Sequence, residues 1–276
     1  MIPAAFEYVR VGSADAAVSA LAEHGDDAKL LAGGMSLLPL MKLRLATPSV
    51  LVDVGRVDDL SYVEDAGEHL AIGALTRHRD LETSELLRAD CGVLCGVAGE
   101  VGDNQVRHRG TLGGSVAHGD PASDLPAVLL ALNASFVVRG PNGEREVPAT
   151  SFFEGFLETA LAPDELLTEI RVPKCGAGGW SYQKFNRRAQ DWAIVGALAV
   201  RAGGSTRVAL VNMGPTPLRA SAVESALASG AGPAEAASQA AEGTDAPSDL
   251  SASPEFRAHL ARVLVGRALE QIAPAA

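Results

Sequence analysis

Two neighbouring glycines, Gly33 and Gly34, follow an apolar run of strand type at residues 29–31 and precede Ser36. Ser36 can cap the next segment, Leu37–Leu45, which the sequence predicts to be a short helix. A backbone that turns here exposes several N–H groups together, and glycine lets it approach a ligand closely. Because a helix start also carries partial positive charge, the predicted ligand is a phosphate or pyrophosphate. An ordinary tight turn is the alternative interpretation.

A second glycine-rich segment, residues 107–115, supports the first interpretation. It offers small hydroxyl side chains and bare backbone N–H groups, and Arg107 and Arg109 stand at its start. Two such loops in one chain suit a diphosphate that is held from both sides. Neither loop fits a standard nucleotide signature, since the chain contains no G-x-x-x-x-G-K-[ST] and no G-x-G-x-x-G opening a βαβ unit. The sequence therefore predicts a phosphate site of a different architecture.

The sequences around the two loops resemble those of a known family. AGGMSLLPLMKLRL (residues 32–45) and RHRGTLGGSVAHGDPASDLPAVLLAL (residues 107–132) are similar to the FAD-binding medium subunit of molybdenum hydroxylases, the group that includes carbon monoxide dehydrogenase and xanthine dehydrogenase. The similarity continues at residues 184–188 and 208–219. The start of the chain, residues 2–8, and the overall length are most like the carbon monoxide dehydrogenase type.

The resemblance implies that FAD lies against both loops, where the flavin brings the reactivity and the protein supplies position and polarity. At Met35 the family more often has Gln or His, so the role of this side chain stays open while its backbone contact is expected. We expect no catalytic acid or base and no metal ligand. The positions expected to bind the cofactor are Leu30, Leu31, Ala32, Gly33, Gly34, Met35, Ser36, Leu37, Thr111, Gly113, Gly114, Ser115, Asp124, Leu167, Lys184 and Trp192.

Four of these positions lie outside the loops, and each has a plainer alternative or a specific role. Asp124 can accept hydrogen bonds from the ribitol or ribose hydroxyls, or can simply cap a helix. The resemblance places Leu167 near the ring as a backbone and apolar contact. Lys184 is either a cation that stabilises the negative charge of the reduced flavin or a surface lysine. Trp192, in the segment 187–193, either stacks near the ring or belongs to the core.

The order of the elements predicts an α+β fold. Residues 1–173 resemble a two-subdomain FAD-binding domain of the vanillyl-alcohol-oxidase or PCMH type, with subdomains at about 1–58 and 59–173. Residues 174–276 are expected to form a small C-terminal domain, in which helices pack on a three-stranded antiparallel sheet. The last helix should bury one stripe of side chains: Phe256, Leu260, Val263, Leu264 and Leu269.

Hydrophobic periodicity and turn residues predict the individual elements. A helix capped by Ser13 should end at Gly25. The other predicted helices cover residues 37–45, 81–88, 92–101, 124–132, 221–229, 233–241 and 254–272. The predicted strands cover residues 29–31, 50–54, 62–64, 70–72, 135–139, 144–147, 165–172, 180–187, 193–201 and 206–213.

Composition and charge narrow the class of protein. The 276 residues are 47% apolar and 21% charged, which is enough for one large core or several smaller ones. A formal net charge of −11 with scattered arginines argues against nucleic acid as a partner. No apolar run approaches the roughly 20 residues of a membrane span, and the N-terminus lacks the pattern of an export signal. We therefore expect a cytoplasmic protein, and association with the inner face of the membrane would depend on its partners.

The cysteines and histidines predict no metal centre. Cys91, Cys95 and Cys175 are an odd number suited to free thiols, and the first two are expected to be small buried side chains. An iron–sulfur cluster needs about four thiolates, so such clusters must lie in other subunits. The six histidines lack ligand spacing. Arg107 and Arg109 are expected to pair with carboxylates or phosphates.

The resemblance implies a flavoprotein subunit. Its FAD would take electrons from [2Fe–2S] clusters in a small subunit and pass them to an external acceptor, while a large subunit oxidises the substrate at a molybdenum cofactor. The expected assembly is a dimer of heterotrimers. Three alternatives remain: a self-sufficient flavin reductase or oxidase, the medium subunit of an aldehyde, purine or N-heterocycle hydroxylase, and a non-redox scaffold that has lost its cofactor.

Overall fold

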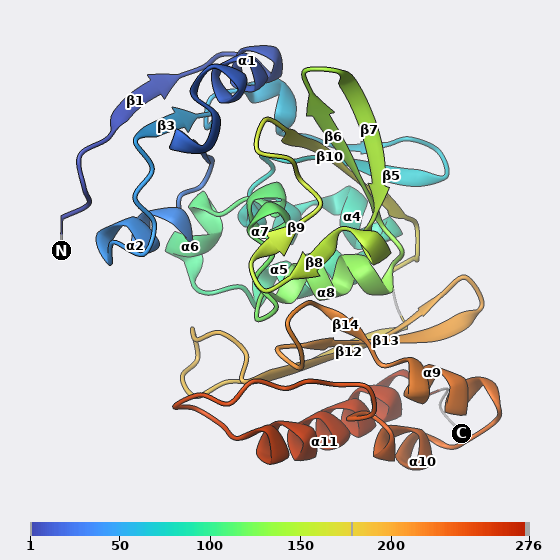
Figure 1. Ribbon diagram of the computed structural model, residues 1–276. Coiled ribbons are helices and arrows are strands. Elements are labelled where there is room, and N and C mark those ends of the chain that lie inside the picture. The colour runs from blue at the N-terminus through green and yellow to red at the C-terminus, as the bar shows by residue number, and fades with distance from the viewer. Residues whose placement is uncertain (1, 178, 274–276) are drawn as a thin grey trace.

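The N-terminal part of the chain forms a small parallel sheet that carries the first glycine loop. The computed structural model describes residues 2–177 and 179–273. Strands β1 (Glu7–Arg10), β3 (Val50–Asp53) and β2 (Ala28–Leu31) pair in that order, all parallel (Figure 1). Parallel neighbours need crossover connections, and these are made by α1 (Ala14–His24) and α2 (Leu37–Lys42).

The caps of α1 are confirmed, whereas those of α2 differ from the prediction. Ser13 Oγ accepts a hydrogen bond from the Ala16 N–H at 3.1 Å. Ser36 makes no such bond, and α2 stops at Lys42 because the chain turns at Arg44, whose φ is 58°. Strand β1 was not predicted, since most of its residues are exposed and it lacks an apolar alternation.

The second unit is built on a five-stranded antiparallel sheet. Its strand order is β4-β5-β10-β6-β7. A β-bulge between Leu167 and Glu169 interrupts the pairing of β10 with β6, and a separate two-stranded hairpin, β8–β9, follows β7. The strands are β4 (Val63–Asp65), β5 (His69–Gly73), β6 (Ser135–Gly140), β7 (Gly143–Pro148), β8 (Phe153–Gly155), β9 (Glu158–Thr159) and β10 (Leu166–Pro173).

Six helices follow one another in the chain between β5 and β6, and two predictions about them are wrong. The predicted helix 81–88 is two helices, because Ser84 leaves the helical conformation and caps the second one through the Leu87 N–H at 3.2 Å. The segment 107–115 is not a loop, since it contains the end of one helix and the start of the next. The six are α3 (His78–Thr83), α4 (Glu85–Asp90), α5 (Gly92–Gly99), α6 (Asn104–Arg109), α7 (Leu112–His118) and α8 (Asp124–Ala131).

The C-terminal unit has four strands rather than three. Strands β11 (Trp180–Phe185), β12 (Val195–Ala202) and β13 (Ser205–Val211) were predicted, and β14 (Leu218–Arg219) was missed because two residues carry no detectable pattern. Helix α11 (Pro254–Ile272) packs on this sheet beside α9 (Ser221–Ala228) and α10 (Pro233–Ser238). Leu260, Leu264 and Leu269 are buried as predicted. Val263 is only partly buried, and Phe256 is 43% exposed and lies against the ring of Phe185 instead.

The unit with the five-stranded sheet and the C-terminal unit pack closely against each other. Helices α5 and α8 lie between the five-stranded sheet and the C-terminal sheet (Figure 1). A Cβ on Gly96 of α5 would come within 2.1 Å of the Trp180 ring, so glycine permits this contact. Nearby, the Sγ atoms of the buried Cys91 and half-buried Cys175 are 3.2 Å apart. No helix within the described ranges is long and apolar enough to cross a membrane.

Candidate functional site

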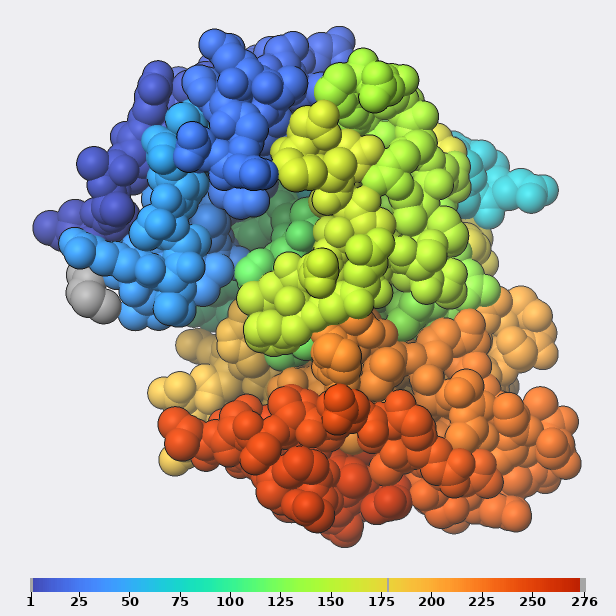
Figure 2. Space-filling model, in the orientation of Figure 1, coloured from blue at the N-terminus to red at the C-terminus, as the bar shows by residue number. Residues whose placement is uncertain are grey.

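All sixteen residues predicted to bind the cofactor border one cavity of about 630 Å³. This volume is within the ~300–1,000 Å³ range of small-molecule sites. Figure 2 shows a hollow between the blue N-terminal unit and the yellow-green chain near residue 160. Residues 28–37, the start of α7 and the segment 190–192 all reach it, so it is walled by all three units. The structure therefore brings together positions that are more than 150 residues apart.

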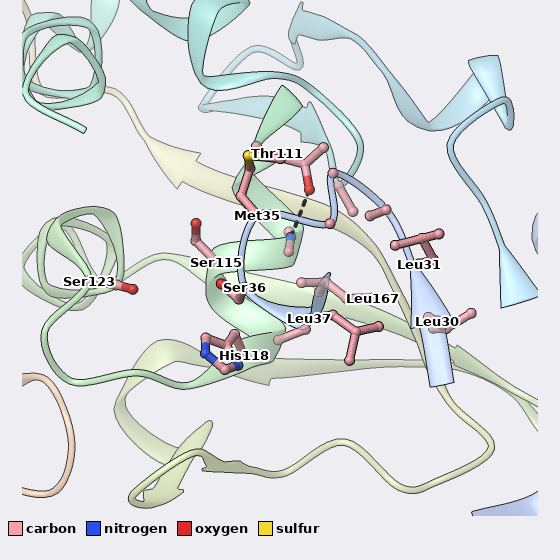
Figure 3. A pocket seen from close by; sticks show the side chains of 18 of the residues that line it. Leu30, Leu31, Met35, Ser36, Leu37, Thr111, Ser115, His118, Ser123 and Leu167 are labelled. Atoms are coloured by element: carbon pink, nitrogen blue, oxygen red, sulfur yellow. Dashed lines mark hydrogen bonds between the residues drawn. The ribbon is translucent and has the colours of Figure 1, made fainter. Parts of the chain in front are cut away.

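The first glycine loop supplies unpaired backbone donors. The N–H groups of residues 33–37 meet no hydrogen-bond acceptor among the residues that the structure describes. Gly34 has a φ of 76°, a left-handed conformation that glycine adopts easily. The side chains of Met35, Ser36 and Leu37 lie beside the segment that begins at Thr111 (Figure 3). Successive free N–H groups in a turn can form a concave site for an anion, which is the kind of site that the sequence predicts here.

Gly33 brings the two segments into direct backbone contact. A Cβ at this position would be 2.3 Å from Arg109 O and 2.9 Å from Gly110 Cα. Arg77 holds the other side of the contact, because its guanidinium donates to the same Arg109 carbonyl oxygen. The loop is therefore seated on the turn between α6 and α7, and only glycine allows this approach.

The second segment contributes less than predicted. The Gly113 N–H donates to Ala74 O at 2.9 Å, and the Gly114 N–H donates to Thr111 Oγ1 at 3.1 Å (Figure 3). The expectation of bare N–H groups at these two glycines is wrong, because the protein caps its own helix there. Gly113 serves close packing, since a Cβ would lie 2.5 Å from the Ala74 Cβ. The Ser115 hydroxyl remains next to the cavity.

Asp124 and Lys184 form a buried ion pair at the cavity wall. Lys184 Nζ lies 2.8 Å from Asp124 Oδ2 and 3.0 Å from Glu100 O, and both ionised side chains are 7% exposed. Tyr182 donates to the other Asp124 oxygen at 2.5 Å. Burial raises the pKa of Asp124, and the attraction of Lys184 opposes the rise. The surface-lysine alternative is wrong, and so is the helix-cap alternative, because Ser123 occupies the cap position of α8.

Leu167 and Trp192 border the cavity in different ways. Leu167 is 4% exposed and lies where the bulge in β10 breaks the ladder to β6. Trp192 is 55% exposed, so the core alternative for this residue is wrong. Gln190 and Asp191 of the predicted flavin-side segment also line the cavity.

The fluorescence of Trp192 can test whether FAD binds in the cavity. We expect FAD to quench its indole fluorescence, and Trp192→Phe to remove most of that quenching while changing the free energy of unfolding by less than about 0.5 kcal/mol, as is usual for exposed sites. Trp180, which packs on α5, serves as the matched control, and Trp180→Phe should keep the quenching. Equal quenching in wild type and Trp192→Phe would contradict this placement.

Several lining residues were not predicted, and His78 is the most informative. It is 2% exposed, and its Nε2 lies 3.2 Å from Ser115 Oγ. A lone histidine between a turn and a polar helix gives no pattern that points to a site. His118, which follows the second segment, also lines the cavity, and burial lowers its pKa. Arg107 pairs with Glu82 at 3.0 Å, as predicted.

His78 gives the folded protein a specific pH dependence. Burial, together with the positive charges of Arg107 and Arg77, lowers its pKa from 6.5 to about 4. Between pH 6.5 and pH 4, His78 is protonated in the unfolded chain but not in the folded protein. The free energy of unfolding therefore falls as pH falls through this range. The full effect is about 3 kcal/mol. Urea unfolding at pH 7 and pH 4 should show a smaller loss for His78→Gln than for wild type, and equal losses would contradict the shift.

The residues present fit a flavin dinucleotide. The free N–H groups of residues 33–37 suit a diphosphate, which is negatively charged. Leu30, Leu31 and Leu167 provide apolar surface for rings, and the Lys184 ammonium carries a positive charge. A polar anion site and an apolar wall in one cavity are what such a cofactor requires.

Comparison with known families defines the class of protein. The family described as "FAD binding domain in molybdopterin dehydrogenase" matches residues 4–175, and the one described as "CO dehydrogenase flavoprotein C-terminal domain" matches residues 180–272. The chain therefore belongs to the family of FAD-binding medium subunits of molybdenum hydroxylases. The predicted two-part α+β fold is confirmed by the same matches.

Individual relatives place the chain within that family. It is 43% identical to the carbon monoxide dehydrogenase medium chain of Hydrogenophaga pseudoflava, over 98% of this chain and 97% of that one. It is 37% identical to the 6-hydroxypseudooxynicotine dehydrogenase complex subunit alpha of Paenarthrobacter nicotinovorans, over 98% and 95%. A solved carbon monoxide dehydrogenase from Hydrogenophaga pseudoflava superposes with a TM-score of 0.92 over 98% of both chains.

Proposed function

We propose that this chain is the electron-transfer subunit of a molybdenum hydroxylase complex of the carbon monoxide dehydrogenase type. Its FAD would receive electrons from iron–sulfur clusters of a small partner subunit and deliver them to an external acceptor. A large partner subunit would oxidise the substrate at a molybdenum cofactor, in a dimer of heterotrimers. We expect this complex in the cytoplasm, where the three thiols would stay reduced.

The observation that carries the proposal is the single cavity in which both glycine segments meet the Asp124–Lys184 pair. We assign the diphosphate to the free N–H groups of residues 33–37, which act without any side chain. The sixteen predicted contacts remain part of this proposal, although the N–H groups of Gly113 and Gly114 already donate within the protein. FAD, when bound, accepts and releases electrons one or two at a time.

Lys184 lies at the cavity wall and has an unused N–H donor, so it can act on the flavin. An ammonium group has three N–H donors, and Asp124 and Glu100 take two of them. Among the residues that the structure describes, none accepts from the third, so it is available to an acceptor in the cavity. Since a cation favours the negatively charged form of a neighbouring group, Lys184 would favour the reduced flavin. Asp124 holds the ammonium in place from the protein side.

The chemistry of the large subunit determines the substrate, and the relatives suggest two classes. Carbon monoxide is the first candidate, because the medium chain with 43% identity belongs to a carbon monoxide dehydrogenase. An N-heterocyclic or related organic substrate is the second candidate, because a relative with 37% identity belongs to 6-hydroxypseudooxynicotine dehydrogenase.

Purification of the chain with and without its co-expressed partners tests the proposal. We expect extracted flavin to be FAD, and we expect the flavin absorption of the chain alone to persist when carbon monoxide, aldehydes or N-heterocycles are added. In the complex, which should contain molybdenum and iron, one of these substrates should bleach it. Turnover by the chain alone would instead support a self-sufficient flavin enzyme, and the absence of flavin binding would support a scaffold without cofactor.

A further inference from the structure

His78 lies directly behind the hydroxyl of Ser115, at the cavity wall. Its side chain is almost fully buried, with Nε2 3.2 Å from Ser115 Oγ. Its backbone N–H donates to Gly110 O at 3.0 Å, which fixes the start of α3 against the α6–α7 turn. The second ring nitrogen, Nδ1, is buried and has no hydrogen-bond partner among the described residues. The ring is therefore held in place with one partner only.

The proton of the ring can be assigned from this network. The ring is neutral near pH 7, because its pKa is lowered to about 4. A neutral imidazole has one N–H, which is on either Nδ1 or Nε2. A proton on Nδ1 would leave a buried donor unpaired, which is rarer in proteins than an unpaired acceptor. The proton therefore belongs on Nε2, where it donates to Ser115 Oγ.

This tautomer decides what Ser115 offers to a ligand. A hydroxyl has one hydrogen and two lone pairs. If Ser115 donated to His78, lone pairs alone would face the cavity and would repel an anion. Since Ser115 accepts from His78, its hydrogen remains free, and Ser115 Oγ has no second partner in the part of the chain that the structure describes. The hydroxyl is thus left as a donor for a negatively charged group.

We propose that His78 is a positioning residue that orients the Ser115 hydroxyl toward the diphosphate of the cofactor. The inference rests on the proposed function, because it assumes that a dinucleotide occupies this cavity. The second glycine segment then recognises the diphosphate through a side chain, whereas the first uses backbone N–H groups.

Binding of FAD, ADP and riboflavin to the apoprotein tests the inference. His78→Leu and Ser115→Ala should each weaken FAD and ADP binding about tenfold, the effect of losing one hydrogen bond to a charged group. Riboflavin has no phosphate, so its affinity should not change. His78→Gln restores an N–H donor near the Nε2 position and should recover most of the FAD affinity. The double variant should bind FAD no more weakly than Ser115→Ala alone.

Long-range ¹H–¹⁵N NMR spectra of the wild-type protein test the tautomer independently of the variants. They should show the imidazole proton of His78 on Nε2. A proton on Nδ1, an equal loss of riboflavin affinity or additive losses in the double variant would each overturn the inference. These outcomes differ from failure of the proposed function, in which the wild-type apoprotein would bind no FAD.

Discussion

Replacing Gly33 by alanine should abolish tight FAD binding. The added Cβ would lie 2.3 Å from Arg109 O, a backbone atom that cannot swing away as a side chain would. The loop or the α6–α7 turn must therefore shift. The N–H groups of residues 33–37 would then no longer point together at one diphosphate. Loss of two charge-assisted hydrogen bonds corresponds to a decrease in affinity of about 100-fold or more.

Equilibrium dialysis with the apoprotein measures this loss, and urea unfolding should show a decrease in stability of about 1–3 kcal/mol from overpacking. Gly12→Ala is the matched control in the same unit, because a Cβ on Gly12 meets no atom within 4 Å. Unchanged FAD affinity in Gly33→Ala would refute the assignment of this loop to the diphosphate.

Replacing Lys184 by methionine should destabilise the apoprotein by about 3–5 kcal/mol. The substitution removes one member of a buried pair and leaves the Asp124 carboxylate without its counter-charge in a desolvated place. The double variant Lys184→Met/Asp124→Asn should recover part of this loss, since it removes the uncompensated charge. The free energy of unfolding in urea is the quantity to measure.

Lys174→Met is the matched control for this experiment. Lys174 also pairs with two carboxylates, those of Asp65 and Asp90, but these groups are 30–49% exposed. Exposed pairs contribute about 0–1 kcal/mol, so the control should lose no more than that. Similar losses in the two lysine variants would show that the Asp124–Lys184 pair is less desolvated than its burial indicates.

Elements with strong local signals could be predicted from the sequence. Helix α1 has a serine cap, an apolar stripe and a terminal glycine, and the β6–β7 hairpin has a Pro-Asn-Gly turn. Helix α6 and the start of α7 could not be predicted, because glycines and polar residues at 107–115 are equally typical of a loop. Strand β14 gains its structure only from pairing with β13. Tertiary contact decided these cases, not local propensity.

The candidate site could be predicted only through the resemblance. Spacing alone suggested two phosphate loops, but the two glycines of the second one, Gly113 and Gly114, use their backbone N–H groups within the protein. Asp124 and Lys184 are 60 residues apart, so no local pattern announces their pairing. His78 was missed for the same reason, since its partner Ser115 is 37 residues away. The domain limits at residues 58 and 173, and the cofactor contacts, stay predictions.

The three-sided wall of the cavity has a thermodynamic consequence. A ligand that touches all three units stabilises the arrangement in which they are assembled, by RT ln(1 + [L]/Kd). At 100 times the dissociation constant this amounts to about 2.7 kcal/mol. Scarcity of flavin in the cell would thus lower the amount of intact chain as well as its loading, and would couple the supply of assembled subunit to the supply of vitamin.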